Sequence, residues 1–272
     1  MKGILICTMN NKGGVGKTTL SCNLGAALAR MNKRILIVDN DSQCNSTGIL
    51  LKETNITNTL HEFLDPDTKI DVGSCVYQTT QKNLYCIPNV RETSGLEMEL
   101  IKLYPDSQYI LKNELRSYAI ENFDFTIIDT PPNIGLFVYS SLLCSDFVIV
   151  PINAGSAYSL DGLNEALDHI TAIREDGNPE LRFLRLLINF VDKRTSICNI
   201  TVEDIYNKYE NDQVFKTIIP VNTTIQQAEY SKKTIFDYDQ SSKGARAFRT
   251  LGKELLDILE NQDGTKNTGS KT

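Results

Sequence analysis

The chain has few of the features that mark membrane, secreted or metal-binding proteins. No apolar run in its 272 residues approaches the roughly 18–20 residues that span a bilayer. The apolar run after Lys2 continues directly into a glycine-rich segment, so we expect no cleavable signal peptide. Seven cysteines are scattered without a C-x-x-C pair, which is typical of reduced thiols, and we assign no chemistry to His61 and His169. These absences favour a cytoplasmic protein.

The overall charge speaks against a nucleic-acid partner, but its distribution is uneven. The net charge is −6 and the isoelectric point about 5.1. Between Arg182 and Lys253 there are 12 Lys and Arg against 8 Asp and Glu, which is +4 and leaves −10 for the rest of the chain. A basic face in this part would contact phosphates in a salt-dependent way, although solvated lysines on a helical face are the alternative. The candidate DNA-binding residues are Lys232, Lys233, Lys243, Arg246 and Arg249.

Strand-like and helix-like patterns alternate along the chain at a steady rhythm. This alternation predicts an α/β fold with a doubly wound, mostly parallel sheet. We expect strands at 3–9, 34–39, 84–88, 125–129, 147–151, 184–189 and 214–219, and helices at 20–31, 95–103, 107–121, 157–173 and 244–259. Residues 1–261 are expected to form a single domain. The polar, glycine- and threonine-rich stretch 262–272 is expected to be a disordered tail.

Residues 10–19 read Asn-Asn-Lys-Gly-Gly-Val-Gly-Lys-Thr-Thr and lie between an expected strand and an expected helix, as a phosphate-binding loop (P-loop) requires. Glycines let successive backbone N–H groups turn toward phosphates at the N-terminus of a helix. Lys17 would neutralise the β- and γ-phosphates, and the Thr18 hydroxyl would bind Mg²⁺. The sequence therefore predicts a P-loop NTPase whose nucleotide-binding residues here are Lys12, Gly13, Gly14, Val15, Gly16, Lys17, Thr18 and Thr19.

Acidic residues stand at the ends of two expected buried strands. Asp129 ends one of them, and Asp39 and Asp41 follow another. Ligands of open parallel sheets bind beyond the carboxyl ends of the strands, so these carboxylates are candidates for work on the nucleotide and its metal. The alternatives are an ordinary strand-terminating aspartate for Asp129 and, for the other segment, an acidic turn that caps the following helix.

The glycine-rich loop departs from the usual G-x-x-x-x-G-K-[ST] spacing, because Asn11 stands where the first glycine belongs and Lys12 opens the loop. The pattern K-G-G-x-G-K-[ST]-[ST] resembles the deviant Walker A motif of the ParA/MinD ATPases. In that family the leading lysine reaches across a dimer interface to the phosphates held by the partner subunit. The resemblance implies this role for Lys12, and with it a homodimer that forms with ATP.

Two further segments resemble the same family. Residues 127–132, Ile-Ile-Asp-Thr-Pro-Pro, match its D-x-P-P and make Asp129 similar to a Walker B aspartate. Residues 39–47 resemble D-x-D-P-Q-x-N-x-[ST], with Ser42 in place of the proline. By this resemblance Asp41 orients the water that attacks the γ-phosphate and Asp39 lies near the metal. The resemblance thus implies the catalytic residues Lys12, Lys17 and Asp41 and the metal site Thr18, Asp39 and Asp129.

A third strand end carries Asn189, whose amide can both donate to and accept from a purine edge. Related ATPases place an asparagine near adenine here, although a loop-starting asparagine is an equal alternative. Residues 219–222, Ile-Pro-Val-Asn, resemble the family's I-P-x-N, which implies a nucleotide contact for Pro220. Arginines that relatives often carry in this stretch are replaced by Val221 and Thr224. The resemblance runs from residue 3 to about 256 and leaves 50–105 without a readable role.

The resemblance is closest to the small, Soj-like partition ATPases that lack an N-terminal helix-turn-helix domain. It implies a Mg²⁺-dependent ATPase, slow alone, that binds nonspecific DNA as an ATP dimer. A ParB-like centromere-binding partner would then trigger hydrolysis during plasmid or chromosome segregation, in the cytoplasm and on the nucleoid. Three alternatives stay open: a MinD-like or other cargo-positioning ATPase, a nucleotide-gated scaffold with little hydrolysis, and iron–sulfur ligation as in the related nitrogenase iron protein. The polar stretch 264–272 offers no apolar face for a membrane.

Overall fold

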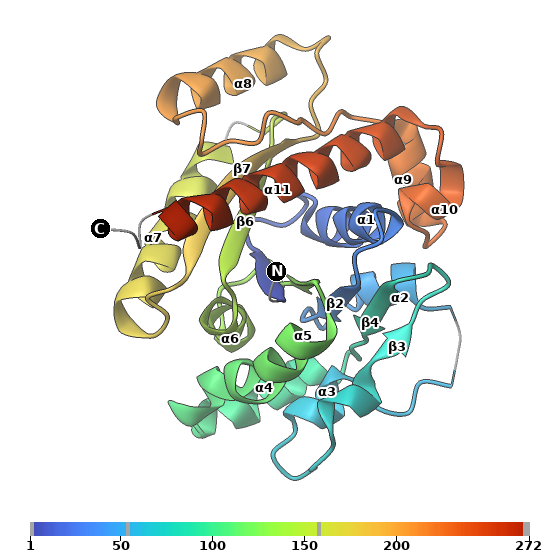
Figure 1. Cartoon of the computed structure of the whole chain (residues 1–272), viewed down its shortest axis with the longest axis vertical. Coiled ribbons are helices and arrows are strands. Elements are labelled where there is room, and N and C mark those ends of the chain that lie inside the picture. The colour runs from blue at the N-terminus through green and yellow to red at the C-terminus, as the bar shows by residue number, and fades with distance from the viewer. Residues whose placement is uncertain (1–2, 53–54, 157–158, 269–272) are drawn as a thin grey trace.

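A seven-stranded sheet forms the centre of the computed structural model, which describes residues 3–52, 55–156 and 159–268 (Figure 1). The strand order is β3-β4-β2-β5-β1-β6-β7, and every neighbouring pair is parallel except β3 and β4. The predicted fold, a doubly wound and mostly parallel sheet, is confirmed. The strands are β1 (Ile4–Thr8), β2 (Ile35–Asp39), β3 (Tyr77–Gln78), β4 (Leu84–Ile87), β5 (Phe125–Asp129), β6 (Phe147–Asn153) and β7 (Arg182–Asn189).

Helices cover both faces of this sheet because its strands carry apolar side chains on both faces. Ile6, Ile37 and Ile127 pack in one apolar cluster with α1 and α11, whereas Leu36 and Ile128 pack in another on the opposite face with α4 and α6 (Figure 1). The α-helices are α1 (Lys17–Arg30), α2 (Asn45–Leu50), α3 (Leu60–Leu64), α4 (Thr93–Lys102), α5 (Arg116–Asn122), α6 (Leu136–Cys144), α7 (Ser159–Asp176), α8 (Ser196–Lys208), α9 (Thr223–Tyr230), α10 (Ile235–Asp239) and α11 (Lys243–Thr268).

Most of the expected elements are present, with shifted boundaries. The helix expected at 107–121 is instead a succession of a 3-10 turn, a π-helical turn (Leu111–Leu115) and α5. The helix expected at 157–173 is α7, and residues 157–158 lie outside the described part. α11 continues through Thr268 into the expected tail; residues 269–272 lie outside the described residues, and the disorder of the tail stays a prediction.

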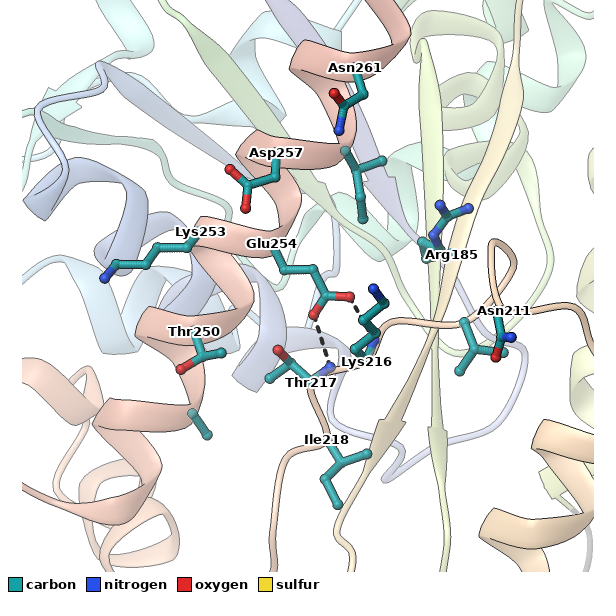
Figure 2. A pocket seen from close by; sticks show the side chains of 13 residues that line it. Arg185, Asn211, Lys216, Thr217, Ile218, Thr250, Lys253, Glu254, Asp257 and Asn261 are labelled. Carbon is teal, nitrogen blue, oxygen red and sulfur yellow. Dashed lines mark hydrogen bonds between the residues drawn. The ribbon is translucent and has the colours of Figure 1, made fainter.

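The strand expected at 214–219 is wrong, and the outer edge of β7 shows why. The segment pairs with β7 through one isolated bridge, Leu186 to Val214, and through a hydrogen bond from Ile219 N–H to Ile188 O at 3.0 Å; a second isolated bridge joins Val191 to Pro220. Between the bridges, the backbone N–H groups of Lys216 and Thr217 donate to the Glu254 carboxylate of α11 at 2.6 and 2.9 Å (Figure 2). The Glu254 side chain has therefore taken the Thr217 donor that would have faced β7 in a ladder continuing from Phe215. The segment, Arg185 of β7 and α11 line a cavity of about 670 Å³ (Figure 2).

Replacing Glu254 by Ala is expected to lower the free energy of unfolding by about 1–3 kcal/mol, because two backbone donors lose their acceptor. Urea unfolding of the purified chain measures this. Glu254→Gln, which keeps one acceptor oxygen, should lose less. Asp257→Ala is the matched control, since this exposed carboxylate lines the same cavity and accepts no hydrogen bond from a described residue. Equal losses in the Glu254→Ala and Asp257→Ala variants would contradict the assignment.

Within the described ranges no helix is both long and apolar enough to cross a membrane. All seven cysteines carry free thiols, and Cys144 is the buried last residue of α6. In that same part of the chain, no three or more His, Cys, Asp or Glu side chains gather into a group that could hold a metal ion.

Candidate nucleotide site

The P-loop lies at the carboxyl ends of three neighbouring strands. β5 pairs with both β1 and β2, and the register places Asp129 opposite Thr8 on one side and Asp39 on the other. The chain leaves β1 after Thr8, turns through 9–16 and enters α1 at Lys17. The sheet thus brings the glycine-rich loop and two of the three predicted strand-end carboxylates to one edge, as expected for a parallel sheet.

The glycines give the loop a shape that other residues would not adopt. Gly14 and Gly16 have φ angles of 73° and 88°, in the left-handed region that favours glycine. A Cβ on Gly16 would lie 2.2 Å from Nδ2 of Asn189, so a side chain is excluded there. No atom lies within 4 Å of the position that a Cβ would take on Gly13 or Gly14. The loop is therefore closed against the protein at Gly16 and open at Gly13 and Gly14, which leaves room for a phosphate.

Lys17 points into the loop and is only 7% exposed. Its Nζ donates to the carbonyl oxygens of Asn10 at 2.9 Å and Lys12 at 3.3 Å. Burial lowers the pKa of this amine, and the charges of Asp129 and Asp41 oppose that shift. The predicted phosphate-binding lysine is therefore positioned in the loop by backbone acceptors and is close to both carboxylates.

Asp129 is fully buried, and hydroxyl groups surround its carboxylate. Ser46 Oγ donates to it at 2.6 Å and Ser21 Oγ at 3.1 Å. Burial raises its pKa, and hydrogen bonds from Ser46, Thr18 and Ser21 oppose the rise. The structure thus places Thr18 and Asp129, two of the predicted metal-binding residues, next to each other. Hydroxyl and carboxylate oxygens are ligands that Mg²⁺ accepts, usually with phosphate oxygens and waters, so this pair fits that ion.

Asp39 is also buried, but its carboxylate is used within the protein. One oxygen accepts from the backbone N–H of Thr47 at 2.7 Å and from its hydroxyl at 2.6 Å; the other accepts a long bond from Asp41 N–H at 3.4 Å. Burial and the charge of Asp129 raise the pKa of Asp39 to about 7. Asp39 fixes the start of α2 beside the site, and its contact with a metal stays a prediction.

Asp41 lies on the loop after β2 and is 7% exposed. Its Oδ1 accepts from the backbone N–H of Gln43 at 2.9 Å, which orients the carboxylate. Its backbone N–H donates to Asp39 Oδ1 at 3.4 Å, and Asp39 is the register partner of Asp129. The structure therefore brings the predicted water-orienting residue to the same point as the P-loop lysine and the strand-end carboxylate.

Lys12 lies against the N-terminal part of α7. Its backbone N–H donates to Asn10 Oδ1 at 2.9 Å, and its Cδ and Cε lie 3.0 Å from the position that a Cβ would take on Gly162. The neighbouring Asn11 side chain donates to the Glu165 carboxylate. Helix α7 thus fixes the opening of the loop, a contact that the sequence motif does not show.

Asn189 is brought to the loop, but both ends of its amide are bound within the protein. Nδ2 donates to Val15 O at 2.9 Å, and Oδ1 accepts from Phe190 N–H at 3.0 Å. Beside it, a cavity of about 490 Å³ is lined by Gly14, Phe190, Val221 and other residues. The amide therefore supports the P-loop, and the predicted adenine contact of Asn189 and nucleotide contact of Pro220 stay predictions.

The five predicted DNA-binding residues lie in and around α9, α10 and the start of α11, which contact one another. Lys232 lines a cavity that also contains Thr18. The Arg249 guanidinium lies 5.5 Å from the centroid of the Phe236 ring and donates to the backbone at the end of α10. Arg246 donates to the carbonyl of Ser241. Lys233 is half-buried and Lys243 exposed. Their DNA contacts stay predictions.

Sequence reasoning missed several residues at this edge. Ser46 belongs to a recognised motif but had no assigned role. Glu229 of α9, which accepts from the Thr19 hydroxyl, follows the I-P-x-N segment in a stretch that resembles the family but had no assigned role, and Arg91 of the loop after β4 lies in the segment 50–105 without a readable motif. No local signal could have found these two, because only the fold brings them to α1.

Known proteins resemble the chain over most of its length. A family profile described as an AAA domain matches residues 3–183. The sporulation initiation inhibitor protein Soj of Bacillus subtilis is 36% identical over 254 residues, which are 93% of this chain and 98% of Soj. The chromosome partitioning protein ParA of Myxococcus xanthus is 35% identical over 255 residues, 93% and 88% of the two chains. A structure of cobyrinic acid a,c-diamide synthase from Mycobacterium smegmatis, with ADP and magnesium, is 27% identical with a TM-score of 0.80, covering 95% and 96%.

Proposed function

The chain belongs to the ParA/MinD family of P-loop ATPases, and from that premise we propose that it hydrolyses ATP in the partition of DNA. The observation that carries the proposal is the position of Lys17, Asp41 and Asp129 at the carboxyl ends of β1, β2 and β5. Two relatives with at least 35% identity over 93% of this chain are named for sporulation control and chromosome partitioning. The site supports ATP hydrolysis, and the relatives support the biological role.

In this proposal ATP binds with its phosphates in the P-loop and with Mg²⁺ at Thr18 and Asp129. Mg²⁺ would supply positive charge to the β- and γ-phosphates. Lys17 binds the same phosphates and replaces its present carbonyl partners, Asn10 and Lys12, with anionic oxygens. Asp41 orients a water toward the γ-phosphate. Because phosphoryl transfer has a loose transition state, positioning and charge neutralisation are sufficient contributions from these residues.

The switch in this proposal is an ATP-dependent homodimer. Lys12 reaches the phosphates of the partner subunit, so ATP favours the dimer by a few kcal/mol. The dimer binds nonspecific DNA, and a ParB-like centromere-binding protein stimulates hydrolysis and release. Turnover of the protein alone is slow, since an ATPase that hydrolysed its ATP without the partner would not persist on DNA.

The test is binding to nonspecific duplex DNA with ATP, with ADP and without nucleotide, each across a salt series. We expect binding only with ATP and a steep loss with salt. The double variant Lys243→Gln/Arg246→Gln should reduce the slope of log K against log salt by about 2, that is, about 1 for each cation removed. Lys82→Gln, an exposed lysine outside the basic stretch, is the control.

Two outcomes would contradict parts of this proposal. ATP-dependent dimers that bind no DNA would favour a MinD-like or other cargo-positioning ATPase. Dimers that form with ATP and do not hydrolyse it, alone or with a partner, would favour a nucleotide-gated scaffold.

A further inference from the structure

A polar cavity of about 560 Å³ opens beside the start of α1, on the side away from the Phe190 cavity. Thr18 contributes to its wall. The remaining residues come from the loop after β2, from α2, from the loop after β4 and from the end of α9: Gln43, Cys44, Asn45, Gly48, Ile49, Arg91, Glu229 and Lys232. The cavity therefore joins the proposed metal-binding threonine and the motif at 39–47 to Arg91 and Lys232, which have no part in the nucleotide-site motifs.

The charges in this cavity are unbalanced. Its single carboxylate, Glu229, accepts from the Thr19 hydroxyl and is thereby fixed to α1. Its two cations, Arg91 and Lys232, make no ion pair with any residue in the described ranges. Arg91 and Cys44 line the same cavity; burial and the charges of Asp39 and Asp41 raise the pKa of Cys44 to about 12, and the charge of Arg91 opposes this rise. Two cations beside the residue expected to bind the Mg²⁺–phosphate group would attract an anion.

The backbone at Lys232 strengthens this interpretation. Its φ is 50°, a left-handed conformation that a lysine disfavours and a glycine adopts freely. The end of α9 imposes it, because Lys232 N–H donates to Glu229 O and Lys233 N–H to Ala228 O, each at 2.9 Å. The side chain then extends toward α2, with Cδ 3.9 Å from the position of a Cβ on Gly48. A lysine kept in an unfavourable conformation beside an anion site is more consistent with a binding role than with a structural one.

We propose that Arg91 and Lys232 bind the phosphate chain of the nucleotide from the Thr18 side of the P-loop. The proposal rests on the ATPase function proposed above and extends it to the segment 50–105. Nucleotide binding would then connect the loop after β4 and the turn between α9 and α10 through one ligand. Lys232 would accordingly act on the nucleotide, and not on DNA as its sequence context indicates.

The test compares Lys232→Gly, Arg91→Gln and the control Lys82→Gln by calorimetric titration with Mg–ATP and with adenosine. Lys232→Gly and Arg91→Gln should each raise the Kd for Mg–ATP between about threefold and about tenfold, because each removes a charge-assisted contact. Affinity for adenosine, which has no phosphate, should not change. Lys232→Gly should melt at or above the wild-type temperature, since glycine suits the backbone at this position. Lys82→Gln should match wild type in every measurement.

Each contrary result overturns the proposal in a recognisable way. Unchanged Mg–ATP affinity in both variants, with wild type binding ATP, would remove the phosphate contacts and leave the ATPase function intact. If the variants lost affinity for Mg–ATP and for adenosine to the same extent, the effect of the substitutions would be structural. Weaker binding of Lys232→Gly to duplex DNA, with unchanged Mg–ATP affinity, would return Lys232 to the DNA surface. If wild type bound no ATP, the proposed function itself would fail.

Discussion

Asp41→Ala is expected to lower ATP turnover about 100-fold while ATP-dependent dimers still form. The carboxylate lies close enough to Lys17 and Asp129 to shift their pKa values, and the Gln43 N–H fixes its orientation. Its removal takes away the group proposed to orient the attacking water and leaves the phosphate-binding residues in place. Phosphate release measures turnover, and light scattering after size-exclusion chromatography measures the dimer.

Asp41→Asn is the matched variant for this prediction. Its amide oxygen can still accept from Gln43 N–H, so the loop keeps its shape while the charge is lost. Turnover as slow as in Asp41→Ala would assign the effect to the charge. Normal turnover in both variants would exclude Asp41 from catalysis, and loss of the ATP dimer in both would indicate a structural role.

Lys12→Ala is expected to raise the dissociation constant of the ATP dimer at least about 30-fold, as expected for loss of a desolvated charge contact across an interface. The fold should be retained, since the backbone contact with Asn10 does not use the side chain. Nucleotide binding by the monomer should persist because Lys17 supplies the contact within the same chain. Sedimentation velocity with ATP across a concentration series measures the dimer.

Two further variants make the Lys12 result specific. Asn11→Ala removes the contact with Glu165 on α7 without changing charge, so it shows what loosening the loop alone does. Lys17→Ala should lose nucleotide binding, and with it the dimer. A Lys12→Ala protein that dimerises and hydrolyses ATP as wild type does would remove the functional basis for the role assigned to the leading lysine.

Sequence patterns predict secondary structure best where the residues of one contiguous segment determine it. The buried runs at β1, β2, β5, β6 and β7 are strongly apolar, and each became a strand of the sheet. The segment 214–219 has a similar pattern but lost its ladder, because Glu254, more than thirty residues away in sequence, took two of its donors. The short antiparallel strand β3 has too few residues to give a periodic signal.

The same distinction holds for the site: local motifs predicted some of its residues, and others are brought there only by the packing of distant segments. Contiguous motifs predicted the loop around Lys17 and the carboxylate at Asp129, and both lie where the motif places them. A residue type alone could not show that the amide of Asn189 would be bound to the P-loop, since the same amide suits a purine edge equally well. Arg91 and Lys232 carried no nucleotide-site signal, because their proximity to Thr18 depends on how α9 and the loop after β4 pack.

The hydrogen bond from Asn189 to the Val15 carbonyl has a consequence for how ligand fragments bind. Val15 belongs to the loop that would hold the phosphates, and Asn189 ends the strand beside the cavity lined by Phe190. A base or a phosphate group that orders either the loop at Val15 or the strand end at Asn189 also orders the other segment. The base and the phosphates of one nucleotide therefore share part of the entropy cost of binding. An intact nucleotide would therefore bind more tightly than the summed affinities of its base and its phosphates indicate, which is a chelate effect within a single ligand.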